Sequence, residues 1–173
     1  LSGTGSPEGV VTAAPGSTWL QTDATTDVKG WIRWVKATGT GNTGWQVGPE
    51  ADTGWRNVAA GLLNSYTGSI AIRRIGATVH LQMTSVTGAT ANDVYTLATG
   101  WRTGGPGARF YSQRVAGGAA YPARAYTADV PGAALTISSL SGTPAMASGD
   151  SWNLTASWPT PDAWPSSLPG SAA

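Results

Sequence analysis

Arginine and aromatic side chains gather in one part of the chain, between residues 101 and 126. Aromatic rings offer flat faces for stacking on sugars, and guanidinium groups form paired hydrogen bonds with phosphate or carboxylate. We therefore interpret this region as a candidate binding site for a hydroxyl-rich or acidic glycan. The alternative is an ordinary half-exposed β face on which arginines stack against rings. The candidate ligand-binding residues are Trp101, Arg102, Arg109, Tyr111, Tyr121, Arg124 and Tyr126.

Residues that could hold a metal or act as a nucleophile–base pair are few. His80 is the single histidine and there is no cysteine, so a zinc site of imidazoles or thiolates is incomplete. No G-x-S-x-G motif accompanies His80, which we interpret as an outward-facing strand residue. Residues 39–44 match G-x-G-x-x-G, but the following residues cannot begin a helix, and the match indicates a hairpin turn. We expect no catalytic residue, no metal and no cofactor.

Four acidic residues leave one enzymatic alternative open. Glu50, Asp93, Asp129 and Asp150 could converge in the fold, and a glycosidase needs only two carboxyl groups about 5 Å or about 6.5–9.5 Å apart. Each of them stands among Gly, Pro, Ser or Asn residues, where hydrogen bonds within turns explain an acid equally well. We favour a protein that is not an enzyme. Two carboxylates facing each other in a cleft would favour a wall-polymer hydrolase.

The composition sets the fold class and excludes two kinds of partner. Only 11% of the 173 residues are charged, against roughly 25% in typical globular proteins, and the chain holds 24 Gly and 11 Pro. Such a sequence is poor in helix formers and rich in turn residues, which predicts an all-β fold. A net charge of +1 argues against binding to nucleic acid. No apolar run approaches ~18 residues, so we expect no membrane insertion.

The first 50 residues predict a small β unit that cannot stand alone. After a linker at residues 1–8, short extended pieces are expected at 9–12, 18–22, 30–36 and 44–47, and together residues 9–50 form a shoulder module. Residues 31–36 alternate so that both faces of their strand carry apolar side chains. About 40 residues are too few to bury them, so we expect the shoulder to associate with copies of itself. The expected oligomer interface contains Trp19, Trp31, Trp34, Val35 and Trp45.

Residues 51–158 predict a larger antiparallel β domain. The segments 69–75 and 78–84 form a hairpin around Gly76, with Val79, Leu81 and Met83 facing inward. Further strands are expected at 94–98, 109–115, 120–128, 133–138 and 151–158, with helix confined to a turn near 57–64. This spacing indicates a β-sandwich or jelly-roll-like head.

The segments that flank the head are interpreted as connections. Residues 48–52 contain Gly and Pro and are expected to form a hinge between the two units. Residues 159–173 are rich in proline and are expected to be extended. Trp164 favours a tail that lies over a neighbouring subunit.

Residues 5–19 (GSPEGVVTAAPGSTW) and 31–47 (WIRWVKATGTGNTGWQV) carry the one resemblance to a known family. They resemble a short module near the C-terminal ends of minor tail proteins and tail fibres from phages of actinobacteria. The resemblance weakens through residues 52–57 and 72–79 and ends at about Leu81. It implies a shoulder followed by a tip domain at the C-terminal end of a longer polypeptide, assembled three-fold.

Together these observations predict a part of a virion at the tail tip or tail fibre. Its expected function is non-enzymatic receptor binding, in which a homotrimer attaches to a cell-wall saccharide or anionic wall polymer of the host. Three-fold presentation would raise the strength of a weak single site. The main alternative is a purely structural module that caps the fibre or docks other tail proteins, and an exposed apolar patch would favour it.

Overall fold

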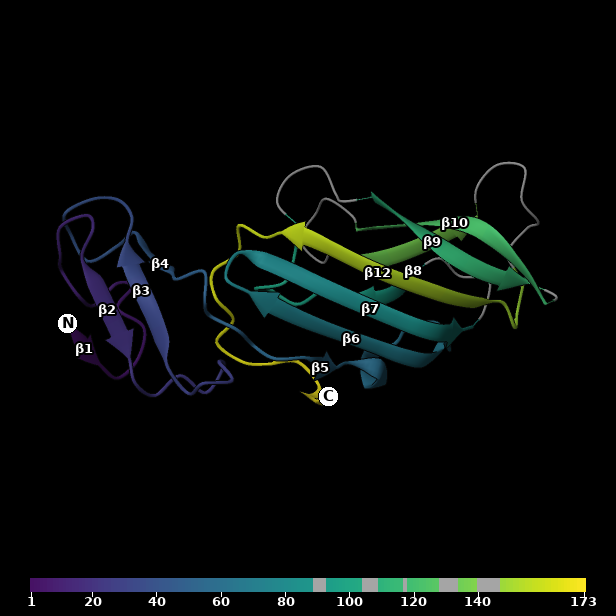
Figure 1. Ribbon diagram of the computed structural model, residues 1–173, viewed down its shortest axis with the longest axis horizontal. Coiled ribbons are helices and arrows are strands. Elements are labelled where there is room, and N and C mark those ends of the chain that lie inside the picture. Colours follow the sequence, from purple (N-terminus) through teal and green to yellow (C-terminus); the bar gives the residue numbers. More distant parts are fainter. Residues whose placement is uncertain (89–92, 104–108, 117, 128–133, 140–146) are drawn as a thin grey trace.

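The computed structural model in Figure 1 describes residues 1–88, 93–103, 109–116, 118–127, 134–139 and 147–173. Within these ranges the regular structure is β-strand, apart from the single 3₁₀ turn η1 (Ala59–Gly61). The strands form one sheet of four and one of nine. The all-β prediction is confirmed. In the described ranges no helix has the length and apolar character needed to cross a bilayer.

The N-terminal unit is a four-stranded sheet in the order β1-β2-β3-β4. On β3, Trp34 and Lys36 alternate onto the buried face while Arg33 is exposed, so one face of the small sheet is covered. The strand expected at residues 9–12 is absent, because Gly9 has a φ of 77° and the amides of Val10 and Val11 both bond to the carbonyl of Pro7 in a turn. The strands are β1 (Ser2–Gly3), β2 (Thr18–Gln21), β3 (Ile32–Lys36) and β4 (Trp45–Val47).

The second unit, or head, is a nine-stranded sheet in the order β13-β5-β6-β7-β12-β9-β10-β11-β8. Every neighbouring pair in it is antiparallel. Its strands are β5 (Arg56–Asn57), β6 (Thr67–Ile75), β7 (Thr78–Thr87), β8 (Asp93–Thr96), β9 (Arg109–Ala116), β10 (Ala119–Thr127), β11 (Ala134–Ser139), β12 (Ser151–Pro159) and β13 (Ser171–Ala172).

The nine-stranded sheet curls until its two ends approach each other. Tyr95 on the end strand β8 forms a bridge with Leu62, which follows β5 and η1 near the other end. The amide of Leu63 donates to the carbonyl of Val94 at 2.9 Å. In Figure 1 the strands β6, β7 and β12 form one layer and β9 and β10 lie over it. This closure produces the sandwich-like head that the strand spacing predicts.

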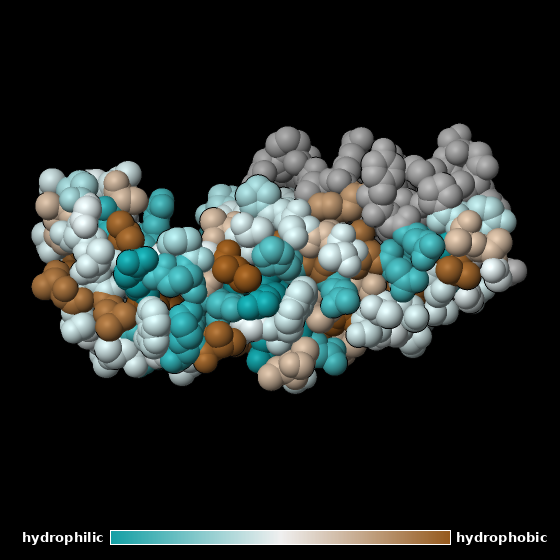
Figure 2. Space-filling model, in the orientation of Figure 1, coloured by the Kyte–Doolittle hydropathy of each residue, from teal (hydrophilic) through white to brown (hydrophobic). Residues whose placement is uncertain are grey.

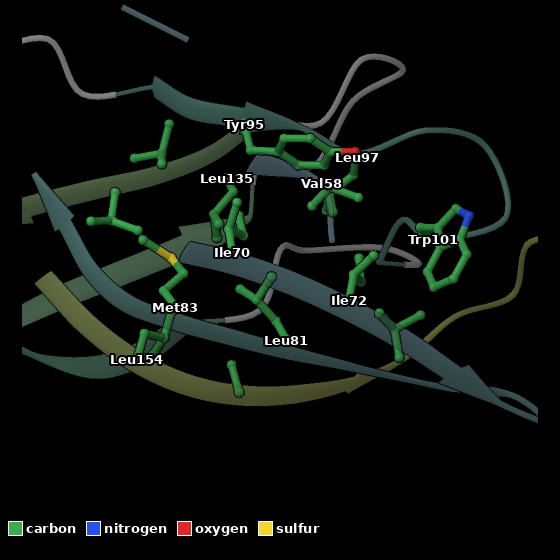
Figure 3. Packing of buried hydrophobic residues seen from close by; sticks show 14 of the residues in the cluster. Val58, Ile70, Ile72, Leu81, Met83, Tyr95, Leu97, Trp101, Leu135 and Leu154 are labelled. Carbon is green, nitrogen blue, oxygen red and sulfur yellow. The ribbon is translucent and has the colours of Figure 1, made fainter. Parts of the chain in front are cut away.

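The core of the head fills the space between these layers (Figure 3). Val79, Leu81 and Met83 are buried on β7, as the alternation predicts, and Ile70 and Ile72 lie beside Met83 and Leu81 on the paired strand β6. Burial of each such side chain contributes about 1.5–3 kcal/mol. The same parity rule is confirmed on β12, where the buried residues are Trp152, Leu154, Ala156 and Trp158.

The C-terminal segment, residues 160–173, returns along its own chain between the two units. Trp164 packs against the core of the N-terminal unit, and β13 pairs with β5 through Ser171 opposite Asn57. The expectation of a tail lying over a neighbouring subunit is therefore replaced by a contact within the chain. The reason is that the small N-terminal sheet leaves an apolar face that Trp164 covers.

Candidate functional site

A cleft of about 770 Å³ lies between the N-terminal unit and the head. The strand β4 and residues near it form one wall, and the segment 160–166 forms the other. Figure 2 shows the surface notched at the upper edge where the two units meet. The lining residues of the N-terminal unit are Ser6, Glu8, Gln21, Thr25, Thr26, Trp34, Trp45, Gln46 and Val47, and those of the head include Arg74, Asp162 and Trp164.

Three indoles line the cleft, and a hydrogen bond fixes the orientation of each. Trp34 Nε1 donates to Gln21 Oε1 at 3.1 Å, and Trp45 Nε1 donates to the carbonyl of Val11 at 2.9 Å. Trp164 Nε1 donates to Thr26 Oγ1 at 2.8 Å and so joins the C-terminal segment to the N-terminal unit. Trp34 and Trp45 belong mainly to the core, whereas Trp164 is half-buried and presents the most accessible ring.

Arg74 holds the wall formed by the C-terminal segment. Its guanidinium donates to the carbonyls of Gly100 at 2.6 Å, Ala163 at 2.8 Å, and Asp162 and Gly76 at 2.9 Å each. The guanidinium carbon also lies 5.2 Å from the ring centre of Trp164, a cation–π distance. Burial lowers the pKa of Arg74 to about 10, so the group remains charged at neutral pH. The chain at 160–164 is therefore fixed by one buried cation.

Two carboxylates line the cleft from opposite walls. Glu8 accepts the backbone amides of Gly44 at 3.1 Å and Trp45 at 2.7 Å. Asp162 Oδ2 accepts the backbone amides of Gly100 at 2.8 Å and Arg102 at 3.2 Å. Both acids thus hold the loops that form the cleft.

Ion pairs fix the segment that joins the two units. Arg73 binds Asp52 with both ends of its fork, at 2.9 and 2.5 Å, and this hydrogen-bonded pair lowers the pKa of Asp52. Arg33 Nε donates to Glu50 Oε1 at 2.6 Å, which lowers the pKa of Glu50. The expected hinge at residues 48–52 is therefore tied to both units, and the cleft has defined walls.

The sequence-predicted ligand residues divide among different places, and none of the seven lines this cleft. Trp101 is only 1% exposed and packs in the core of the head (Figure 3), so the prediction of a ligand-stacking ring is wrong for this residue. Arg102 is half-buried and donates from Nε to the carbonyl of Leu97 at 3.3 Å.

The remaining five residues lie on the hairpin of β9 and β10. The backbone register places Arg124 opposite Tyr111 and Tyr126 opposite Arg109, so these four occupy one face of the hairpin. Their side chains lie outside the described part of the structure. Tyr121 lies opposite Arg114 on the other face of the hairpin. Arg114 is buried there and forms an ion pair with Asp150 at 2.5 Å. The hairpin thus collects four of the seven predicted residues at adjacent positions.

The residues predicted for an oligomer interface also divide. Trp34 and Trp45 are 7% and 5% exposed, because the core of the N-terminal unit and Trp164 cover them within one chain. A second subunit is not needed to bury these two rings. Trp31 is 37% exposed, and Trp19 and Val35 are half-buried. Trp19 packs against the same core as Trp34, so the interface prediction is carried by Trp31 and Val35.

The candidates weighed for catalysis have structural partners. Glu50 pairs with Arg33, and Asp150 pairs with Arg114. Asp93 Oδ1 accepts the hydroxyl of Thr136 at 3.0 Å. His80 Nδ1 lies 2.9 Å from Ser157 Oγ on the strand pair β7–β12, and Asp129 lies outside the described residues. Among the residues that the structure describes, no three His, Cys, Asp or Glu side chains are grouped as a metal site.

Sequence reasoning missed the cleft because its walls are far apart in the chain. A signal for Arg74 existed, since it shares strand parity with Ile70 and Ile72 and must face inward with them. Trp164 stood out as a large ring in a proline-rich segment. For Gln21 and Thr26 no local pattern marks a role, because each acts through a partner distant in sequence.

Comparisons with protein-family models, curated proteins and solved structures find no match to this chain. The resemblance of residues 5–47 to phage tail modules therefore rests on its sequence motifs alone. Function has to be argued from the geometry of the cleft and from the exposed surface.

Proposed function

We propose that this chain is a receptor-binding part of a phage tail tip or tail fibre that binds a host cell-surface glycan without chemical change. The observation that carries the proposal is the cleft between the two units, which combines three oriented indoles with hydroxyl and amide side chains. The resemblance of residues 5–47 to tail modules supports the location on the virion. No cofactor takes part in this function.

The lining of the cleft suits a sugar ring. Trp164 is half-buried and offers an apolar ring surface, whose orientation is fixed by its hydrogen bond to the buried hydroxyl of Thr26. Gln46 and Thr25 are exposed in the opposite wall and offer an amide and a hydroxyl. A pocket with apolar faces and a few placed polar groups is the usual form of a small-ligand site.

The N-terminal unit supports association into a homotrimer. All five large hydrophobic side chains that are exposed in the described residues lie in the first 31 positions. Figure 2 shows exposed hydrophobic surface on this unit. Grouped apolar surface of this kind marks interaction sites, and three copies would present three clefts to one cell surface. The residues are Leu1, Val10, Leu20, Val28 and Trp31. Docking to another tail protein is the alternative use of this surface.

A second candidate function is hydrolysis of a wall polymer, because Glu8 and Asp162 both line the cleft. Each carboxylate accepts two backbone amides and so already serves the fold. We therefore rank binding above hydrolysis. Release of new reducing ends from wall polysaccharide during incubation with the protein would reverse this order.

Binding of fluorescently labelled protein to a panel of actinobacterial cells tests the proposal. We expect binding to one group of strains and its loss after the wall glycans are removed. Trp164→Ala is expected to weaken cell binding about tenfold or more, equivalent to about 1.4 kcal/mol, because it removes the accessible ring. The measurement is a binding isotherm by flow cytometry.

Trp55→Ala is the matched control, since Trp55 is a half-buried tryptophan of the head that does not line the cleft. It is expected to leave cell binding unchanged. Equal losses in the two variants would contradict a site in the cleft. Absence of binding to every strain, from a folded sample, would favour a purely structural module.

A further inference from the structure

We propose that the cleft between the two units selects an uncharged saccharide and rejects anionic wall polymers such as poly(glycerol phosphate). This inference rests on the proposed glycan-binding function and names the class of ligand. It starts from the three charged side chains in the lining, which are Glu8, Asp162 and Arg74. Two negative charges and one positive charge give the cleft an excess of one negative charge.

Arg74, the single cation of the lining, is not available to a ligand. Arg74 is 2% exposed, and its guanidinium makes four hydrogen bonds to backbone carbonyls. Recognition of phosphate or carboxylate by arginine depends on two parallel N–H groups directed at the anion. In Arg74 these N–H groups are already bonded to the carbonyl oxygens of Gly76, Gly100 and residues 162–163. The guanidinium therefore supports the wall and does not supply an anion site.

The two carboxylates act against an anionic ligand. Glu8 is exposed and Asp162 is half-buried, one on each wall. A ligand phosphate about 7 Å from one of them meets a repulsion that lowers its affinity about threefold at the dielectric constant of water, and more where the cleft is dry. Because both carboxylates are held by backbone amides, they cannot swing away.

The remaining polar groups of the lining are uncharged and match sugar hydroxyls. Thr25 and Gln46 are exposed and supply a hydroxyl and an amide that donates and accepts. The hydroxyls of Thr26 and Thr160 are buried and already accept hydrogen bonds from Trp164 and from the amide of Asp162. Hydroxyl-rich ligands need such mixed groups, whereas a phosphate needs donors only. The chemistry of the cleft therefore matches a neutral pyranose.

Isothermal titration of the full chain with two kinds of ligand tests the inference. The neutral probes are galactan, arabinan, mannan and glucan oligosaccharides, and the anionic probe is poly(glycerol phosphate). We expect one neutral probe to bind with a Kd that changes less than about twofold between 50 and 500 mM NaCl, since no ion pair is formed. We expect poly(glycerol phosphate) to bind at least tenfold more weakly.

Two kinds of variant locate the binding and separate the outcomes. Trp164→Ala should abolish binding of the neutral probe, while Trp55→Ala should preserve it. Ser166→Glu, a change at an exposed lining position to which no sugar contact is assigned, keeps the test decisive where Trp164→Ala fails to fold. It should change neutral binding by less than about threefold and weaken anion binding further.

The possible failures point to different conclusions. Tighter binding of poly(glycerol phosphate) than of every neutral probe, lost in Trp164→Ala, overturns the inference and leaves glycan binding intact. Binding of neither kind of probe, together with no binding to cells, overturns the proposed function itself. Cleavage of a neutral probe by the protein would mean that the cleft hydrolyses its ligand, and the proposed binding function would be replaced by hydrolysis.

Discussion

Arg74 shows how one side chain can connect distant parts of this chain. It sits on β6, yet its donors reach carbonyls at residues 100 and 162–163 and its charge lies over the ring of Trp164. The buried cation is stabilised by carbonyl oxygens and a ring, with no carboxylate among these partners. Such a site depends on the planar fork of arginine, which lysine cannot reproduce.

Arg74→Met should therefore destabilise the protein by about 2–4 kcal/mol, because several carbonyls lose a charged donor. The loss of structure should be greatest in residues 160–173, because Arg74 bonds to the carbonyls at residues 162–163. We expect a lower midpoint in guanidinium unfolding and faster cleavage in this segment by a protease. Arg33→Met is the control, since Arg33 is an exposed arginine of β3 that bonds to Glu50 and not to the C-terminal segment. Equal cleavage rates in Arg74→Met and the unchanged protein would contradict the role of Arg74 as a clamp.

At the scale of elements, strands that alternate clearly were predictable from sequence. The β6–β7 hairpin and β12 have the expected bounds within a few residues, because buried and exposed positions alternate there with period two. The β9–β10 hairpin was also expected, but its register is what brings Arg109, Tyr111, Arg124 and Tyr126 to one face.

Elements whose position depends on distant partners were not predictable. Residues 9–12 looked extended, but Gly9 has a positive φ and the chain turns. The segment 48–52 looked like a hinge because of its Gly and Pro, and composition gives no sign that its acids meet Arg33 and Arg73. The cleft, formed where the N-terminal unit meets the segment 160–166, could likewise not be found from local patterns.

The pairs at this junction predict a response to acid. Because Arg73 holds the folded pKa of Asp52 below its unfolded value of about 3.9, the pair stabilises the junction at higher pH. That contribution is lost as the pH falls from about 4 through the lowered pKa. Asp52→Asn should remove it, at a cost of about 1–2 kcal/mol at pH 7. Urea unfolding at pH 7 and at pH 3 measures both effects.

Asp93→Asn serves as the comparison, since Asp93 is an acid of the head on β8 and pairs with Thr136. It should keep the part of the stability difference between pH 7 and pH 3 that comes from the Arg73–Asp52 pair, because that pair is unchanged. Asp52→Asn should instead show a smaller difference between the two pH values. An identical difference in both variants would contradict the junction as the source of the acid response.

At the scale of the whole molecule, the chain crosses between the two units at residues 48–52, and Trp164 binds back to Thr26. Beyond Trp164, the C-terminal segment ends as β13 at the edge of the head beside β5. The C-terminal segment thus covers within one chain the aromatic face that otherwise needs a partner. Only the opposite face of the small sheet, with Leu20 and Trp31, is left for association.

Leu20 and Trp31 define the last prediction, which concerns the assembly. They are 39% and 37% exposed, line the same shallow depression of the N-terminal unit, and lie beside Lys29, whose ammonium is 5.0 Å from the ring centre of Trp31. We expect the chain to have three times the mass of one 17.6 kDa chain in light scattering at micromolar concentration. Leu20→Ser combined with Trp31→Ser should shift it to monomer, because little apolar area then remains to offset the entropy of association. Gln82→Ser, an exposed change on β7 of the head, should leave the trimer intact. A monomeric unchanged protein would refute three-fold assembly through this face and would limit cell attachment to the affinity of a single cleft.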